Sequence, residues 1–506
     1  MNQQEIQAEE ELNIEESIVS ADSVDIEKGK NDTVDKKAFF KNVIVVLISN
    51  IISVLSGVLV GFIVPKMLGV TEYGYYKTFT LYSSYIGILH FGFIDGIYLK
   101  FAGKKYEDLD KNKFRTYTRF LFLMELIVSL LVLSFSFVFI GTNYFTLILF
   151  VALNVFATNI ITYFEFISQV TMKFKRITIR NVIRCSFNII SVLFLYFLYR
   201  FNDVEIYNTI YVVIVLSITY ILAIWYAFTY RELIFGKANK FKEERKELLY
   251  FFKVGIPLLM ANLIGQLVFV VDQQFVNILF DNDTYSTYAF AYTLINLVTI
   301  ATSAISVVLY PTLRNMNDES ITKNYSNINS YLLIFVSLCL IAYFPLDVIV
   351  RHFLPNYSQS LDVLIIIIPG VLISSSISVI KYNCYKTFNK ILNYFFKSLA
   401  ILIIAILADL IVYFIFKNTA SISIVSIAVL IVWYLLVEMY FVRVYKVGWI
   451  KNFIYLLLTI AGFYGATFVP NIYLAGVTYL AYFLVITVAL YFRLLQSILV
   501  KVKNRG

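Results

Sequence analysis

Histidine, cysteine and charged residues are all scarce in this chain. Its 506 residues include two histidines and three cysteines, and charged residues make up 15% of the total. The cysteines have neither the paired spacing nor the neighbouring histidines of zinc sites, so we expect no disulfide framework and no metal site. Soluble domains carry about 25% charged residues, so the low charge excludes an ordinary soluble enzyme.

Long apolar runs dominate what is present. Hydrophobic residues make up 60% of the chain, and the mean hydropathy is +0.77. Runs of about 20 apolar residues fit membrane-spanning helices, whereas strands of membrane barrels alternate over about 10 residues. We therefore predict an all-α polytopic membrane protein. It should have about fourteen transmembrane helices, at 42–64, 76–99, 120–140, 145–168, 183–200, 209–229, 254–280, 285–310, 327–349, 362–380, 394–416, 420–441, 452–469 and 474–492.

Lysine and arginine are unevenly distributed over the predicted connections. Alternate connections, together with the two chain ends, carry 37 of the 42 basic residues. The positive-inside rule places these segments in the cytoplasm. We expect a multi-pass protein of the bacterial plasma membrane with both termini cytoplasmic. The opposite connections are short turns, which leaves no large outer loop to carry the catalytic groups of a membrane glycan polymerase.

A short internal repeat favours two related halves. "LISNII" (47–52) and "LMANLI" (259–264) lie 212 residues apart, and the same offset pairs Tyr73 with Tyr285. Such repeats are typical of transporters built from two lobes around a central cavity. Chance similarity between apolar helices is the alternative explanation.

Composition and helix order together predict five segments. Residues 1–40 contain eleven acidic residues and four lysines but no apolar run, which indicates an acidic, disordered cytoplasmic tail. Two six-helix lobes and two extra helices should follow. The predicted boundaries are 41–230 for the N-terminal lobe, 231–253 for a basic cytoplasmic linker, 254–441 for the C-terminal lobe, and 442–506 for the two extra helices with a basic cytoplasmic C-terminus.

Two further segments resemble family motifs. "PKMLGVTEYGYY" (65–76) is similar to the Pro-x-x-Leu-Gly-x-x-x-Tyr/Phe-Gly turn of bacterial polysaccharide flippases, the O-antigen and capsule repeat-unit transporters. "VGIPLLMANLIGQLVFVVDQQFV" (254–276) looks like that family's Gly-x-Pro-x4-Asn start followed by an Asp. The matching residues here are Gly255, Pro257, Asn262 and Asp272.

The resemblance implies the fold of the multidrug, oligosaccharidyl-lipid and polysaccharide exporter superfamily. It also implies that an oligosaccharide on polyprenyl diphosphate moves from the cytoplasmic to the outer leaflet by alternating access. The sequence departs from two relatives, because its first span has neither a carboxylate nor an arginine between Val43 and Val64. Cation-coupled drug exporters use an acid there, and the cavity of lipid II flippases contains arginine.

One face of the predicted span 254–280 is polar over its whole length. At about 100° per residue, four amide side chains fall within an arc of about 60°. Amides that faced lipid would lack hydrogen-bond partners, so they should face the protein interior or water. We predict that they line the substrate path and bind sugar hydroxyls; a polar clamp between helices is the alternative. The four residues are Asn262, Gln266, Gln273 and Asn277.

Asp272 and Asp95 complete the predicted substrate path. A carboxylate near the bilayer centre costs roughly 2.5–3.5 kcal/mol, so Asp272 should either pair with a neighbouring helix or sense a coupling ion, Na+ or H+. Asp95 lies deep in the span 76–99 between Gly92 and Gly96, although these glycines equally indicate close helix packing. The other embedded acids are Glu125, Glu165, Asp409 and Glu438.

A diphosphate-linked substrate also requires cations along its path. The candidates lie at the ends of predicted spans, where a topology-setting or lipid-headgroup role is the alternative for each. They are Lys66, Lys77, Lys100, Arg314 and Lys381.

The predicted function is therefore a non-enzymatic flippase for lipid-linked oligosaccharide. We expect no catalytic residue and no cofactor other than a coupling ion. The expected partners are the lipid-linked oligosaccharide, membrane lipids and polysaccharide-synthesis proteins, with no nucleic acid. A cation-coupled small-molecule or multidrug exporter is the alternative, and a membrane glycan polymerase is a weaker one.

Overall fold

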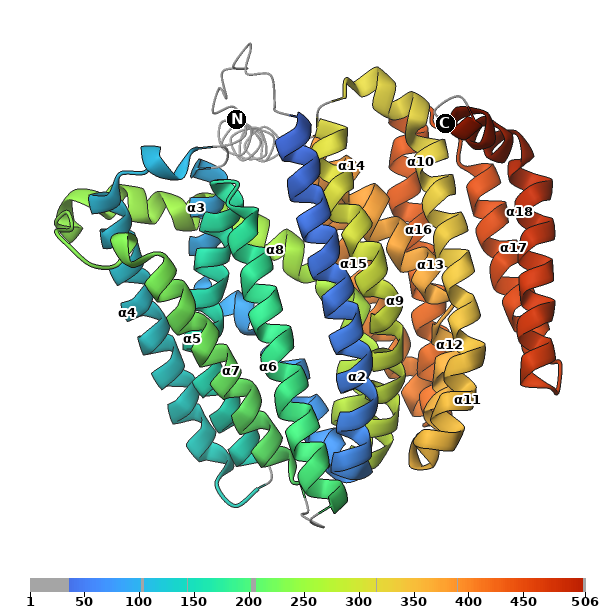
Figure 1. The fold of residues 1–506 in the computed structure, drawn as a ribbon, viewed down its shortest axis with the longest axis horizontal. Coiled ribbons are helices and arrows are strands. Elements are labelled where there is room, and N and C mark those ends of the chain that lie inside the picture. Colours follow the sequence, from blue (N-terminus) through green and yellow to red (C-terminus); the bar gives the residue numbers. More distant parts are fainter. Residues whose placement is uncertain are drawn as a thin grey trace, which may run out of the picture. The chain divides into compact units, whose positions relative to one another are not determined.

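A computed structural model describes residues 36–101, 104–142, 144–201, 206–314, 316–388 and 390–503. The regular elements in these ranges are helices, and the ranges contain no strand, which confirms the all-α prediction (Figure 1). Residues 1–35 of the predicted acidic tail lie outside the described residues.

The described helices have the following bounds. They are α2 (Lys36–Ser83), η1 (Ile86–His90), α3 (Phe93–Phe101), η2 (Tyr106–Asp108), α4 (Lys111–Ser136), η3 (Phe137–Phe139), α5 (Tyr144–Val170), α6 (Phe174–Phe201), α7 (Asn208–Thr229), η4 (Arg231–Leu233), α8 (Phe241–Leu279), α9 (Asn282–Arg314), α10 (Asp318–Cys339), η5 (Leu340–Ala342), α11 (Tyr343–Phe353), η6 (Pro355–Tyr357), α12 (Ser360–Ile367), α13 (Gly370–Ser375), the π-helix η7 (Ser376–Lys381), α14 (Tyr382–Thr387), α15 (Ile391–Phe416), α16 (Thr419–Tyr445), α17 (Ile450–Thr467) and α18 (Ile472–Lys503).

The length and hydropathy of these helices confirm a multi-pass membrane protein. Within the described ranges, eleven helices can cross a membrane, or up to twelve if one bent pair forms a single span. The count of fourteen is therefore not confirmed. Part of the difference lies in α2, which contains the predicted span 42–64 and the start of 76–99. Gly69, with φ 71° and ψ 178°, breaks α2 between these two parts.

The chain forms two compact units whose boundaries fall inside helices. The first unit takes its described residues from 1–49, 83–183 and 216–262, and the second takes them from 50–82, 184–215 and 263–506. Helices α2, α6, α7 and α8 each contribute to both units. The five predicted segments follow the order of the chain instead, and their boundaries stay a prediction.

The first unit is built around an aromatic core. Helices α4 and α5 pack side by side along their length (Figure 1). The rings of Phe164 and Tyr230 stack with centroids 5.2 Å apart, and the ring of Tyr117 meets that of Phe251 edge-on at 5.0 Å. Buried aromatic side chains contribute most of the contact area in such a core, which holds the shorter helices η1 and α3 in place.

Glycine allows α3 to approach α8 closely within this unit. A Cβ atom added at Gly96 would lie 2.1 Å from the carbonyl oxygen of Phe251. One added at Gly255 would lie 1.8 Å from the carbonyl oxygen of Gly92. The two backbones therefore touch where the sequence analysis noted glycines on both sides of Asp95, as in small-residue packing of membrane helices.

The second unit is also a bundle of packed helices. Helix α15 packs against α16, and α17 packs against α18; α17 and α18 are the orange-red and red helices at the end of the chain (Figure 1). Helix α10 contacts both α17 and α18. The π-helix η7 lies against α16 and α10. Because π-helical turns are rare and concentrate at functional sites, η7 marks a region of interest.

Candidate functional site

The amide face of α8 contains two kinds of side chain. Gln266 is exposed and Gln273 is half-buried, and within the described residues neither amide group has a hydrogen-bond partner. Asn277 instead donates a 2.8 Å hydrogen bond to the hydroxyl of Thr78. Asn262 is half-buried and is the last residue of the first unit. Gln266 and Gln273 are thus available to a ligand, whereas Asn277 acts as a clamp between helices.

Asp272 is buried and surrounded by hydroxyl groups. Its side-chain oxygen Oδ2 accepts hydrogen bonds from Tyr288 at 2.8 Å, from Ser426 at 3.0 Å and from Tyr292. The backbone N–H of Gln273 donates to the other oxygen at 2.7 Å. Asp272 is 2% exposed and has no cationic partner in the described part of the chain. Hydrogen bonds from neutral donors therefore replace the ion pair that was one of the two expectations.

A second buried acid lies near Asp272. Asp409 of α15 is 1% exposed, and the charges of the two carboxylates interact. One oxygen of Asp409, Oδ1, is buried and has no hydrogen-bond partner among the described residues. Two neighbouring buried carboxylates do not both ionise unless a cation or proton compensates them. The Asp272 carboxylate and its three hydroxyl donors provide oxygen atoms, the ligand type of small hard cations, and Asp409 adds a second carboxylate in the same region.

The predicted diphosphate-binding cations have diverse surroundings. Lys66 donates a 2.8 Å hydrogen bond to the carbonyl oxygen of Phe353. The ammonium of Lys77 lies 5.4 Å from the ring centroid of Tyr73, and no acidic partner of Lys77 lies among the described residues. The side chain of Arg314 falls outside the described residues. Neither Lys66 nor Lys77 has an acidic partner among the described residues, and Lys77 also lacks the carbonyl acceptor that Lys66 has.

Lys381 is held in a fully buried ion pair. Its ammonium lies 2.8 Å from the carboxylate of Glu438, and both side chains are 0% exposed. It also donates to the Ser376 hydroxyl at 2.8 Å and lies 4.0 Å from the ring centroid of Tyr434. The Tyr325 hydroxyl donates to Glu438 at 3.0 Å. Lys381 could bind a diphosphate only after this pair opened, and that part of the prediction stays a prediction.

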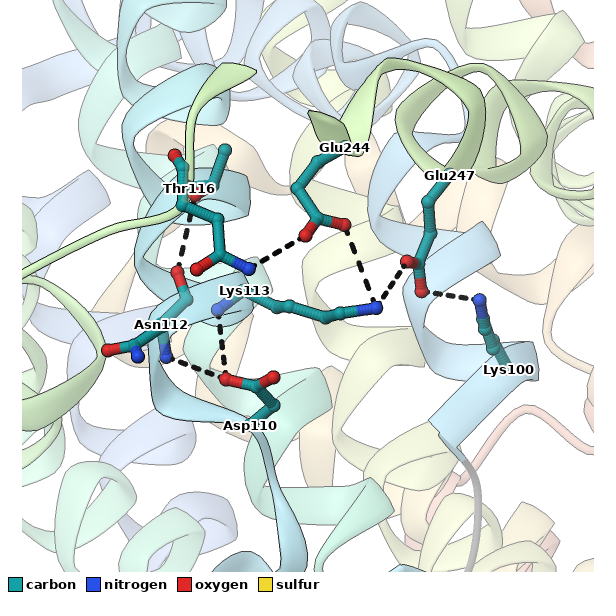
Figure 2. Close-up of polar contacts among 8 residues, drawn as sticks. Lys100, Asp110, Asn112, Lys113, Thr116, Glu244 and Glu247 are labelled. Carbon is teal, nitrogen blue, oxygen red and sulfur yellow. Dashed lines mark hydrogen bonds and ion pairs between the residues drawn. The ribbon is translucent and has the colours of Figure 1, made fainter. Parts of the chain in front are cut away.

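Lys100 takes part in an ion-pair network in the first unit. Its ammonium contacts one carboxylate oxygen of Glu247, and the other oxygen accepts a 3.2 Å hydrogen bond from Lys113 (Figure 2). Lys113 also lies 3.8 Å from Glu244, which accepts a 2.8 Å bond from Asn239. This network ties the ends of α3 and α4 to the start of α8, so Lys100 has a structural partner already.

Hydrogen bonds from α4 hold the predicted linker 231–253 in place. Arg115 donates to the carbonyl oxygens of Glu232 and Lys237, both at 2.9 Å, and Arg119 donates to that of Gly236 at 2.8 Å. A hydrogen bond from Lys111 holds the pKa of the exposed Glu232 carboxyl below its ordinary value. The linker is therefore docked on the first unit.

Asp95 belongs to the first unit, whereas Gln266, Gln273 and Asn277 belong to the second, so its place in the substrate path stays a prediction. Asp95 is 3% exposed and lies 3.7 Å from the imidazole of His90. The sequence analysis did not consider His90 as a partner of Asp95. It also missed Tyr288, Tyr292 and Ser426. No local signal distinguishes them, because the chain contains 39 tyrosines and only the packing of α9 and α16 brings these hydroxyls to Asp272.

Comparison with known proteins identifies the class and then the family. The fold is that of a multi-pass membrane transporter: the lipid II flippase MurJ in its inward closed conformation superimposes with a TM-score of 0.68 at 14% identity, over 90% of this chain and 100% of that chain. A model described as polysaccharide biosynthesis protein matches residues 39–317. The chain belongs to this polysaccharide biosynthesis protein family.

A second solved structure shares the fold more distantly. An inward-facing multidrug resistance MATE family transporter of the MOP superfamily gives a TM-score of 0.56 at 11% identity, over 79% of this chain and 96% of that one. A comparison with curated proteins gives no match. The family model confirms the predicted polysaccharide family, and the two structures confirm the predicted fold.

Proposed function

We propose that this protein is a flippase that moves a polyprenyl-diphosphate-linked oligosaccharide from the cytoplasmic to the outer leaflet for the synthesis of a surface polysaccharide such as O-antigen or capsule. It would act in the bacterial plasma membrane, with both termini in the cytoplasm, as the charge pattern favours. Partners would be the lipid-linked oligosaccharide and enzymes of polysaccharide synthesis.

The observation that carries this proposal is the pair of unpartnered amides on α8. Gln266 is exposed on a helix long and apolar enough to cross the membrane, and Gln273 shares its face. An amide facing hydrocarbon would lose its hydrogen bonds to water without replacement. A polar substrate rich in hydroxyl groups, or the water that precedes it, provides the missing partners. Sugar rings have this chemistry.

Lys77 supplies the cation that a diphosphate requires. Its ammonium is half-buried, lies over the ring of Tyr73, and has no acidic partner in the described residues. Lys77 is held within the second unit by Tyr285, whose hydroxyl donates to its backbone carbonyl oxygen. A charged hydrogen bond from ammonium to phosphate is about twice as strong as a neutral one, so one uncompensated lysine contributes substantially to binding.

A coupling ion would bind at Asp272 and Asp409. The carboxylates and the three hydroxyl oxygens provide only oxygen ligands, and Oδ1 of Asp409 still lacks a partner within the described chain. Na+ bound there, or H+ shared between them, would compensate one of the two negative charges and so relieve the repulsion between the acids. This observation also favours the second candidate function, a cation-coupled exporter of small molecules.

The decisive experiment is deletion of the gene in its native bacterium, followed by mass analysis of polyprenyl-linked oligosaccharides and an assay of their leaflet. Complete repeat units should accumulate on the cytoplasmic leaflet. Complementation with Gln266→Ala plus Gln273→Ala should fail, while Asn277→Ala, whose side chain has a protein partner, should restore export.

Other outcomes would reject the flippase. Normal outward transfer with altered drug tolerance would support the exporter. Repeat units that reach the outer leaflet but are not polymerised would support a polymerase.

A further inference from the structure

The second membrane helix is interrupted inside the first unit. Residues that follow α2 form the short 3-10 helix η1, and α3 then begins at Phe93. Phe91 and Gly92 between them adopt left-handed conformations, with φ values of 50° and 76°. Broken helices of this kind commonly form ion sites in transporters, because backbone groups at the break are free to bind.

The hydrogen bonding of His90 indicates which of its two ring nitrogens carries the proton. The backbone N–H of Gly92 donates to Nδ1 of His90 at 3.2 Å, so Nδ1 is an acceptor and carries no proton. The neutral imidazole then carries its proton on Nε2, which lies 3.7 Å from Oδ2 of Asp95. A doubly protonated ring would direct an N–H group at the N–H of Gly92. Protonation of His90 is therefore incompatible with the present geometry of the break.

One carboxylate oxygen of Asp95 has no hydrogen-bond partner among the described residues. This oxygen, Oδ2, is buried, and the side chains of Asp95 and His90 are both 3% exposed. Asp95 lies in the first turn of α3, whose N-terminal end stabilises negative charge. The Nε2–H group of His90 stands just beyond hydrogen-bond distance, so a small movement of the ring would complete a bond to an ionised Asp95.

We propose that Asp95 and His90 form a proton-binding site at the break in the second membrane helix, separate from the acids on α8 and α15, and that its protonation sets the conformation of the break. An ionised Asp95 attracts the Nε2–H of His90. Proton uptake converts the carboxylate to the neutral acid and releases the ring. Because Nδ1 of the same ring holds the N–H of Gly92, the movement reaches the backbone between η1 and α3.

Three acids on the neighbouring elements have partners of their own. On α4, Glu125 accepts a 2.7 Å hydrogen bond from Asn159 of α5, which also donates to the carbonyl oxygen of Ile86 at 3.4 Å. On α5, Glu165 pairs with Arg180. At the start of α8, Glu247 pairs with Lys100 and Lys113. Glu125 has one unpartnered oxygen, Oε1, within the described residues, and provides the matched control acid.

The scarcity of histidine makes this site directly observable. The chain contains His90 and His352 only, and His352 is exposed in the second unit. The full-length His352→Gln variant, labelled with 15N-histidine and placed in lipid bilayers, would give the imidazole signals of His90 alone. Solid-state NMR should show a protonated Nε2 and an unprotonated Nδ1 at neutral pH. Acidification should shift both signals in one step as Asp95 takes up its proton.

Two variants test the origin of this step. In Asp95→Asn the step should vanish while the tautomer of His90 is retained, which also shows that the break is folded. In Glu125→Gln the step should remain. An Nδ1-protonated tautomer, a His90 spectrum that does not respond to pH, or a step that survives Asp95→Asn would each overturn the proposal.

The link between protonation of Asp95 and transport rests on the proposed transport activity, and it is tested by a separate measurement. One titrating proton changes its site's occupancy by up to about tenfold per pH unit, so transport should depend on pH in the His352→Gln protein and lose that dependence in Asp95→Asn. An unchanged pH dependence in Asp95→Asn would overturn the coupling. Absence of oligosaccharide transport in every variant, with the NMR step intact, would refute the flippase function and leave the proton site standing.

Discussion

Two buried carboxylates of the second unit are stabilised in different ways. Glu438 faces the ammonium of Lys381 at 2.8 Å and is neutralised inside the protein. In the described part of the chain, the donors to Asp272 are hydroxyl and backbone groups, and a second acid, Asp409, lies nearby. Glu438 is therefore compensated by a charge of the protein itself, whereas Asp272 is stabilised by neutral donors among the described residues, which is the basis for proposing an ion there.

The largest effect should come from breaking the Lys381–Glu438 pair. In Lys381→Met the carboxylate of Glu438 would remain buried without a cation, which costs about 3–5 kcal/mol of stability. Chemical unfolding of the purified protein in detergent measures this loss. The double variant Lys381→Met plus Glu438→Gln should recover most of it, because no charge is then left buried. Equal stability of wild type and Lys381→Met would show that the pair is not stabilising.

Asp272→Asn should preserve the fold but abolish the response to a cation. The amide oxygen of asparagine still accepts hydrogen bonds from Tyr288 and Ser426, but its NH2 group cannot accept from the Gln273 N–H, so in the absence of added ion the loss of stability should be about that of one hydrogen bond, roughly 0.5–1.5 kcal/mol. A ligand at 100 times its Kd stabilises a protein by about 2.7 kcal/mol. Thermal unfolding in sodium against choline salts, and over a pH series, should show stabilisation of that order in wild type.

The matched controls for this ion site are Asp409→Asn and Asp347→Asn. Asp409→Asn should also lose the ion response, because it removes the second acid of the set. Asp347 already pairs with Arg351 at 2.8 Å, so Asp347→Asn should keep the response. An ion response that persists in both Asp272→Asn and Asp409→Asn would place the ion elsewhere.

Substitutions of the amide residues of α8 should change stability less than the preceding variants, and the change should differ between these residues. Asn277→Ala removes the hydrogen bond to Thr78, and such bonds between membrane helices contribute about 0.6 kcal/mol on average. Gln266→Ala and Gln273→Ala remove no bond within the described protein, so each should change stability by less than about 0.5 kcal/mol. Oligosaccharide export should show the opposite order of sensitivity. Normal export in both glutamine variants would contradict their place in the substrate path.

The smallest effect should come from the ion-pair network near the start of α8. The side chain of Lys113 is 39% exposed, so water and salt screen its charge. Lys113→Ala should cost about 0.2–1 kcal/mol, and less at high salt. Unfolding measured at low and high ionic strength tests this against Lys381→Met, whose effect should be insensitive to salt. A salt-independent loss for Lys113 would mean that packing rather than charge is responsible.

The periodicity of the sequence identified the helices but not which polar side chains pair with one another. The polar stripe on 254–280 was readable because residues on one face of a helix recur at a fixed spacing, and among the described residues Gln266 and Gln273 have no hydrogen-bond partner. The partners of Asp272 lie 16, 20 and 154 residues away in the chain. Lys381 was assigned to the substrate because nothing in the sequence around it indicates that it pairs with Glu438 of another helix.

The sequence by itself determined that this protein lies in a membrane and that its secondary structure is helical. Its long apolar runs require helices that bury every backbone hydrogen bond, and its motifs indicated the family. Only the tertiary structure decided which polar groups are satisfied. Helix packing pairs Lys381 with Glu438, surrounds Asp272 with hydroxyls and sets His90 beside Asp95. The reason is geometric, because a hydrogen bond needs atoms within about 3 Å, and that distance depends on how helices far apart in the chain are aligned.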